Sequence, residues 1–169
     1  MNEIVYNILT NDFRTSLWQG FADQYGSICH VRTNKRGYRY ETANSTPWES
    51  QLQLFRQGFG IPSDERIIFH RDNTFLSEKH NQGLVITDKR IYFIEDNDYP
   101  LNKISFSWED ILQVKYIDNS MSFYLNTEKF VYINIKFFTK KSSECGLRTI
   151  NEIGLALQDV FNYIIDLIN

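Results

Sequence analysis

The stretch that most constrains the fold lies in the middle of the chain, at residues 83–95. It reads Gly-Leu-Val-Ile-Thr-Asp-Lys-Arg-Ile-Tyr-Phe-Ile-Glu, so two apolar runs flank a polar corner at 87–90. β-branched and aromatic residues suit a half-buried strand, whereas Thr and Asp bond to their own backbone in turns. The stretch therefore predicts a β-hairpin with strands at 84–87 and 91–95. Its turn type stays open, because the corner lacks the Asn-Gly or Asp-Gly pair of the tightest turns.

The sequence around this hairpin keeps the two-residue period of strands. The period is clearest near the end of the series, where Val131, Ile133 and Ile135 alternate with residues that face the other way. Seven short strands are predicted in all, at 66–70, 84–87, 91–95, 103–107, 111–117, 121–125 and 130–137. Short antiparallel strands joined by tight turns are typical of a sandwich or a barrel.

A helical period replaces the strand period before residue 60. Apolar residues from Glu3 to Ala22 predict one long or two short helices that end near Gly26. The tetrapeptide Thr46-Pro47-Trp48-Glu49 is a typical helix start, because Thr caps free N–H groups and Pro suits the first helical position. This helix should end near residues 58–60. The segment 27–43, between the predicted helices, fits a small hairpin and an irregular loop equally well.

The chain ends in a strongly apolar helix, predicted at 146–167. Its apolar face consists of Ile150, Ile153, Leu157, Phe161, Ile164 and Ile168. Such a face has to be buried, so we expect the helix to close one end of a barrel. The tetrapeptide Ile61-Pro62-Ser63-Asp64 is the best boundary, since Pro ends helices. The predicted fold class is α+β, with a helical N-terminal extension at 1–60 and a seven-stranded antiparallel barrel domain with its capping helix at 61–169.

Composition narrows the classes of partner and compartment. The net charge of −3 and the pI near 5.6 give no overall field for nucleic acid, so we expect no nucleic-acid partner. No apolar run reaches the ~18–20 residues of a membrane span, and the first residues lack the basic and apolar regions of a signal peptide. A cytoplasmic location is therefore expected. The two cysteines, Cys29 and Cys145, cannot form a disulfide framework.

The chain from about Ile61 to Asn169 resembles the bacterial branch of the pleckstrin-homology-like fold, which overlaps the GRAM-like group. The residues that carry the resemblance are Glu65-Arg66-Ile67-Ile68-Phe69 with Arg71-Asp72-Asn73-Thr74-Phe75, then Gly83-Leu84-Val85-Ile86-Thr87-Asp88-Lys89-Arg90-Ile91-Tyr92, then Ser107-Trp108-Glu109-Asp110-Ile111. The resemblance implies a seven-stranded antiparallel barrel with one capping helix. It also implies a non-catalytic module that binds proteins, phosphoinositides or membrane surfaces.

Lipid-binding members of this fold concentrate Lys and Arg in the loop between their first two strands. Here that loop is 71–82, in which Asp72 and Glu78 offset Arg71 and Lys79. A headgroup phosphate needs uncompensated cations, so the loop composition favours a protein partner over a lipid.

Residues with catalytic or metal-binding chemistry are scattered. His30, His70 and His80 stand in no ligand spacing with one another, with a cysteine or with a carboxylate. Gly58-Phe59-Gly60 is too short for a phosphate loop, and no signature of an activated nucleophile occurs. We therefore predict no enzyme activity, cofactor or metal. The pair Glu109-Asp110 is interpreted as a solvated turn, and Trp108 as a barrel plug rather than a ligand platform.

A basic and aromatic cluster is the most suggestive local feature. It consists of Arg32, Lys35, Arg36, Tyr38, Arg39 and Tyr40. Cations with stackable rings suit RNA or an acidic protein surface, although a solvated hairpin tip has the same composition. We predict that this cluster belongs to a partner-binding surface.

These observations favour a cytoplasmic, non-catalytic binding module with a protein partner. One version is an immunity protein that neutralises a basic toxin, such as a nuclease, by charge-complementary association. A membrane-surface or lipid-headgroup adaptor is the alternative from another class. A hydrolase or nuclease that uses one of the three histidines is the third.

Overall fold

The computed structural model describes residues 2–12, 30–34, 37–40, 53, 56–72, 83–95, 102–138 and 150–169. Its helices are α1 (Asn2–Asp12), the short 3₁₀ turns η2 (Trp108–Asp110) and η3 (Ile135–Phe137), and α4 (Ile150–Ile168). Its strands are β1 (His30–Asn34), β2 (Gly37–Tyr40), β3 (Ile67–Asp72), β4 (Gly83–Thr87), β5 (Arg90–Glu95), β6 (Asn102–Ser107), β7 (Ile111–Ile117), β8 (Ser120–Leu125) and β9 (Phe130–Asn134).

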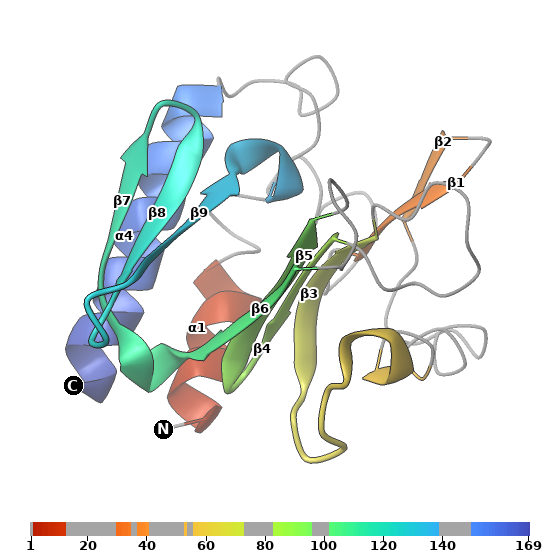
Figure 1. Ribbon diagram of the computed structural model, residues 1–169, viewed down its shortest axis with the longest axis horizontal. Coiled ribbons are helices and arrows are strands. Elements are labelled where there is room, and N and C mark those ends of the chain that lie inside the picture. Colours follow the sequence, from red (N-terminus) through yellow and green to blue (C-terminus); the bar gives the residue numbers. More distant parts are fainter. Residues whose placement is uncertain are drawn as a thin grey trace.

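The strands form two sheets, which Figure 1 shows splayed apart with α1 and α4 beside them. The larger sheet has the order β2-β1-β3-β4-β5-β6, and the smaller one has the order β7-β8-β9. Within each sheet neighbouring strands are antiparallel, except that β1 runs parallel to β3. The predicted α+β class is therefore confirmed.

The seven strands predicted after residue 62 correspond to β3–β9, and the central hairpin is β4–β5. Both faces of that hairpin are buried. Leu84 and Ile86 lie in the main core, whereas Val85 and Tyr92 pack against Phe59 on the opposite face. This double burial explains why the stretch is almost continuously apolar rather than alternating.

The last predicted strand is shorter than expected. The prediction extended it to Phe137, but residues 135–137 form the 3₁₀ turn η3, closed by a bond from the N–H of Phe138 to the carbonyl of Ile135. Phe137 and Phe138 are both buried. The turn places both rings in the same core cluster, whereas a strand would point them to opposite faces.

The two sheets do not close into the predicted barrel. In the described part of the chain no ladder joins them. The chain leaves β6 through a tight corner, where the carboxylate of Asp110 accepts bonds from the backbone N–H of Ser107 at 3.1 Å and from its hydroxyl at 2.7 Å. This N–H, on the side of β6 away from β5, is therefore satisfied by a side chain rather than by a further strand.

The C-terminal helix occupies a sheet edge instead of closing a barrel end. The side-chain amide of Asn162 accepts a bond from the N–H of Val114 at 2.8 Å and donates one to its carbonyl at 2.9 Å. Gln158 accepts a further bond from the N–H of Tyr116 at 2.8 Å. Two side chains of α4 thus take the place of a neighbouring strand along β7.

One core joins both sheets and both long helices. The ring of Trp108 meets Phe161 of α4 edge-on at 5.5 Å between centroids, and Phe161 also contacts Phe123 of β8 at 5.9 Å. Phe123 in turn lies 5.1 Å from Phe106 of β6. Val5 of α1 belongs to the same cluster. Trp108 is 2% exposed, so its predicted burial is confirmed.

The segments before residue 60 are described in part. The first predicted helix is confirmed from Asn2 to Asp12, and its continuation lies outside the described residues. The second predicted helix lies mostly outside them as well, but residues 56–59 are helical and Gly60, at φ +64°, ends that turn as expected. For the segment 27–43 the prediction left a small hairpin and an irregular loop open. The structure shows a hairpin there, β1–β2. None of the described helices combines the length and apolar character needed to cross a bilayer.

Candidate functional site

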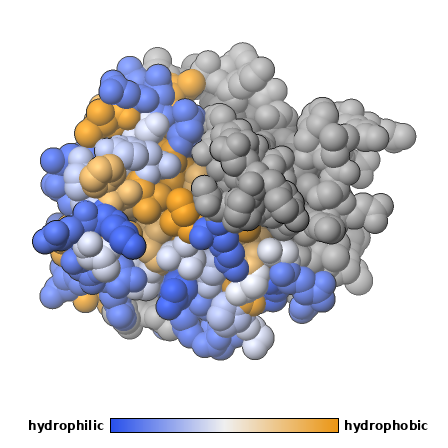
Figure 2. All heavy atoms as spheres, viewed as in Figure 1, coloured by the Kyte–Doolittle hydropathy of each residue, from blue (hydrophilic) through white to orange (hydrophobic). Residues whose placement is uncertain are grey.

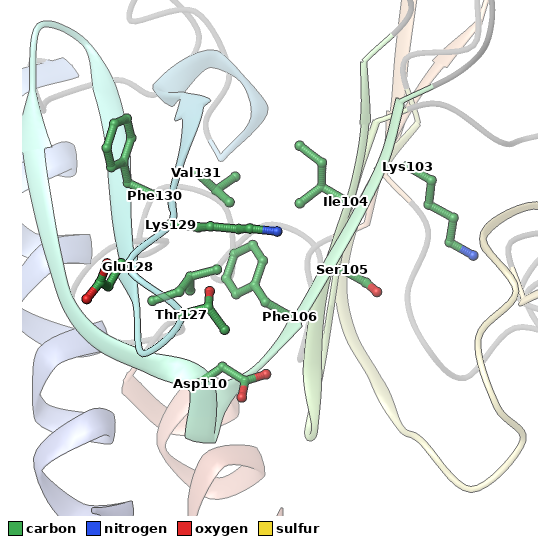
Figure 3. Close-up of a pocket in the computed structure, with 11 residues that line it drawn as sticks. Lys103, Ile104, Ser105, Phe106, Asp110, Thr127, Glu128, Lys129, Phe130 and Val131 are labelled. Carbon is green, nitrogen blue, oxygen red and sulfur yellow. The ribbon is translucent and has the colours of Figure 1, made fainter.

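A cleft of about 730 Å³ opens between β6 and the β8–β9 hairpin (Figure 3). It is lined by residues 103–106 of β6, by Asp110 and Leu125, and by residues 127–131 at the start of β9. Figure 2 shows apolar residues reaching the surface on the face that carries this cleft. The cleft is therefore the opening that remains where the two sheets do not close on each other.

The apolar part of the cleft wall comes from both sheets. Ile104 and Phe106 approach it from β6, and Val131 approaches it from β9 (Figure 3). Phe106 is buried and packs on Phe123, so the floor of the cleft is continuous with the core.

The cleft reaches the outer edge of β6 as well as the face that carries Ile104 and Phe106. Four consecutive residues, 103–106, line it, whereas a strand face would contribute only alternate residues. In an antiparallel pair, alternate residues bond to the neighbouring strand. The N–H of Trp108 bonds to the carbonyl of Lys89 at 3.1 Å, which fixes which residues of β6 bond to β5. Ile104 and Phe106 then bond to β5, while the backbone groups of Lys103 and Ser105 point to the free edge.

The opposite wall also ends in a free strand edge. Bonds from the N–H of Leu125 to the carbonyl of Lys129, and from the N–H of Ile135 to the carbonyl of Asn119, set the alternation between β8 and β9. By this alternation the backbone groups of Phe130 point away from β8. The edge strands β6 and β9 therefore border the same cleft, and in the described part of the chain no further strand pairs with either of them there.

Lys129 is the cation that faces the cleft. Its side chain extends from β9 toward β6, whereas Glu128 turns away (Figure 3). Lys103 also lines the cleft, but its ammonium group is directed outward, donates to the carbonyl of Phe59 and lies 5.9 Å from the ring centre of Tyr92. Among the residues that the structure describes, no carboxylate pairs with Lys129.

The acidic residue of the cleft is already satisfied. Asp110 accepts two bonds from Ser107 and a longer one, at 3.4 Å, from the side-chain amide of Asn126. The bond from the Ser107 hydroxyl, followed by the bond from its backbone N–H, lowers the pKa of Asp110 from its ordinary value. The predicted solvated turn is thus correct for the exposed Glu109, whereas Asp110 is a half-buried structural acid.

A second polar cluster lies beneath the β4–β5 corner. Glu65 is 3% exposed and accepts bonds from the hydroxyls of Thr87, at 2.7 Å, and Tyr92, at 3.0 Å. Burial, and then the neighbouring Glu65, raise the pKa of the Tyr92 phenol. Asp88 accepts two bonds from Arg66, each at 2.9 Å. The polar corner at residues 87–90 is therefore held in place by hydrogen bonds to residues 65 and 66.

The predicted basic and aromatic cluster lies at the other end of the larger sheet. It spans the hairpin β1–β2, and β2 is the edge strand farthest from β6. Arg32 pairs with Arg39 in the register and Thr33 pairs with Tyr38, so the arginine pair and the tyrosines take alternate positions. Lys35, Arg36 and the side chains of Arg32, Tyr38, Arg39 and Tyr40 lie outside the described residues. The partner role of this cluster stays a prediction.

The predicted absence of a metal site is likewise left as a prediction. His80, Cys29 and Cys145, as well as the side chains of His30 and His70, lie outside the described residues. Within the part of the chain that the structure describes, no three His, Cys, Asp or Glu residues come together in a group that could hold a metal ion.

Sequence reasoning missed the cleft because no motif marks it. The residues that line it have the ordinary composition of two strands, and their role comes from topology: β6 and β9 are edge strands. The available signal was indirect, since Lys129 follows a turn and precedes an apolar strand. In the comparisons with known proteins, no family model, curated protein or solved structure matches this chain.

Proposed function

We propose that this chain is a non-catalytic binding module that associates with a protein partner through the cleft between its two sheets. The observation that carries the proposal is that two strand edges, neither with a partner strand among the described residues, border one open and partly apolar cleft. Exposed strand edges pair readily with other chains, and native proteins usually cover or interrupt them. Here α4 covers the edge of β7, while β6 and β9 face the cleft without a described partner strand.

We also propose that residues 61–169 form an open variant of the pleckstrin-homology-like arrangement. The order of β3–β6, then β7–β9, then α4 supports this assignment. It differs from the expected barrel because no ladder joins the two sheets in the described part of the chain. The cleft between β6 and the β8–β9 hairpin is therefore available to a partner.

The charges of the cleft favour a protein over a phosphorylated lipid. A headgroup phosphate is usually held by several convergent cations. Of the described residues that line the cleft, Lys129 alone directs a cation into it, and Ile104, Phe106 and Val131 make up apolar walls. Apolar walls with a few polar groups suit a polypeptide segment.

Site-specific photo-crosslinking tests the proposal. A photoreactive amino acid replaces Thr127, which is exposed at the cleft, and in a matched control it replaces Asp159, which is exposed on the outer side of α4. Both full-length chains are expressed in the source cell, irradiated and purified. We expect a discrete crosslinked protein from the Thr127 chain and none from the Asp159 chain, with the partner identified by mass spectrometry.

Two outcomes would contradict the proposal. Equal crosslinking from both positions would place the partner elsewhere, and crosslinks to lipid alone would favour the adaptor class. A second reporter at Ser105, across the cleft, should give the same crosslinked protein as Thr127.

A further inference from the structure

We infer that the segment that binds in the cleft is an extended acidic and apolar strand, which pairs with the free edge of β6 and places a carboxylate against Lys129. This inference rests on the proposed function and adds the chemistry of the ligand. Its three parts, the pairing edge, the length of the segment and its side-chain pattern, each follow from described contacts.

Of the edges of β6, β7 and β9, that of β6 offers the longest run beside the cleft. Along β7 the backbone groups of Val114 and Tyr116 already bond to α4. At β9 the cleft reaches only Phe130 and Val131, whereas it follows β6 over residues 103–106. An added strand would lie in the cleft and bond to Lys103 and Ser105, with about four backbone hydrogen bonds if each residue both donates and accepts.

The segment that binds should be short. Ser107 would be the next residue to offer a backbone N–H at this edge, but that N–H already bonds to the carboxylate of Asp110 at 3.1 Å. Pairing therefore ends at the corner. A segment of about five residues, close to the usual strand length, would use the whole free edge.

The side-chain pattern follows from the inner wall. Residues of the added strand that lie beside Ile104 and Phe106 face the same side of the sheet as those two, and there they meet Val131 and Lys129. An apolar residue suits Phe106 and Val131. A carboxylate two residues away suits the exposed ammonium of Lys129, which pairs with no carboxylate of the described residues. The expected pattern is an apolar and an acidic residue separated by one position.

The closing experiment uses a random peptide display library as the probe. Peptides are selected on the full-length wild-type chain and, separately, on the Lys129→Glu variant. We expect the wild type to enrich peptides in which Asp or Glu and an apolar residue alternate, and the variant to enrich Lys or Arg at the acidic position. Because Lys129 is exposed, its replacement should leave the fold intact, which circular dichroism checks.

Backbone pairing is tested with a proline. Ser105→Pro removes the outward N–H of β6, while Ser105→Ala keeps it, and proline is tolerated at a strand edge whose N–H has no partner. We expect Ser105→Pro to weaken binding of an enriched peptide by about tenfold, the value of one lost hydrogen bond, and Ser105→Ala to leave binding unchanged. N-methylation of the peptide backbone should cause the same loss on the unaltered protein, so the test does not depend on the folding of the proline variant.

The outcomes separate the two proposals. No enrichment on the wild type, or the same acidic preference on Lys129→Glu, would overturn the inferred ligand. If the Thr127 crosslinks still identify a protein, the module binds at the cleft through a different kind of surface, and only the inference fails. If the crosslinks fail as well, the proposed function fails with it.

Discussion

At the scale of single residues, Trp108 links the two sheets. Its ring packs edge-on against Phe161 of α4, and its indole N–H donates to the carbonyl of Thr87 at 3.0 Å. Thr87 ends β4 in the larger sheet, and Trp108 begins the corner that leads into the smaller sheet. The side chain of Trp108 therefore stabilises the corner both by apolar packing and by a hydrogen bond.

Substitution of Trp108 should separate these two contributions. Trp108→Ala removes the ring and leaves a cavity, which typically costs about 3–5 kcal/mol of the free energy of unfolding. Trp108→Phe keeps much of the packing but leaves the buried carbonyl of Thr87 without this donor, at a cost of about 1–3 kcal/mol. Urea unfolding followed by circular dichroism measures both. A loss below about 1 kcal/mol for the alanine variant would contradict a structural role for the ring.

Asp110 gives the corner a dependence on acidity. Its pKa in the folded protein lies below the ordinary value of 3.8, because the Ser107 hydroxyl and backbone N–H bond to the ionised carboxylate. A group whose folded pKa is lowered contributes stability above its unfolded pKa, and this contribution is lost as the pH falls through the folded pKa. We therefore expect Asp110→Asn to be less stable than wild type near neutral pH.

Measurements at acid pH test the direction of this stability difference. The difference in the free energy of unfolding between wild type and Asp110→Asn should shrink as the pH falls below about 4, where the carboxylate becomes protonated in the unfolded chain first. Glu109→Gln, at the exposed neighbouring position, serves as the control. A difference that stays constant from pH 7 to pH 2 would show that ionisation of Asp110 does not stabilise the corner.

At the scale of elements, α4 protects the edge of β7. Asn162 satisfies both backbone groups of Val114, and Gln158 satisfies the N–H of Tyr116. Gly154 allows this close approach, because a Cβ at that position would lie 2.5 Å from the ring of Tyr116. The helix and the strand are thus matched through three bonds between side chains of α4 and the backbone of β7, as well as through the apolar face of the helix.

The loss in the free energy of unfolding should increase with the number of hydrogen bonds that each removed amide makes. Asn162→Ala leaves the N–H and the carbonyl of Val114 unpaired, and we expect a loss of about 2–3 kcal/mol. Gln158→Ala breaks one bond and should cost about 1 kcal/mol. Asp159→Ala, on the exposed side of the same helix, is the matched control and should change little. Thermal or urea unfolding measures the series, and equal effects for all three variants would contradict edge protection.

At the scale of the whole molecule, the sequence predicts the individual strands and helices better than it predicts whether the two sheets close into a barrel. The strands β3–β8 and the helix α4 follow from local patterns, such as the apolar runs around Thr87 and the helical stripe through Phe161. The open corner does not, because it depends on Asp110 bonding to the backbone of Ser107 and on Asn162 bonding to Val114 across 48 residues. Such long-range pairings have no period in the sequence.

The candidate site was unpredictable for the same reason. Lys129 and Phe106 are ordinary residues of a turn and a strand, and only the topology places both beside one cleft. The basic and aromatic cluster stands out in composition, yet it belongs to the opposite edge of the larger sheet. A site made from strand edges depends on which strands lie at the edge of a sheet, and a sequence pattern does not show the order of the strands.

Because one core spans both sheets, the described fold should unfold as a single unit. Ile86 of β4 and Ile133 of β9 are both fully buried in the same cluster, although they belong to different sheets. Ile86→Val and Ile133→Val should each lower the free energy of unfolding by about 0.5–1.5 kcal/mol. In a cooperative domain, each variant should shift the same single transition, seen alike by far-UV and near-UV circular dichroism. Two separable transitions, one sensitive to each variant, would mean that the sheets are independent units and that the cleft between them changes width, in which case a partner would bind by closing the sheets rather than by entering a fixed opening.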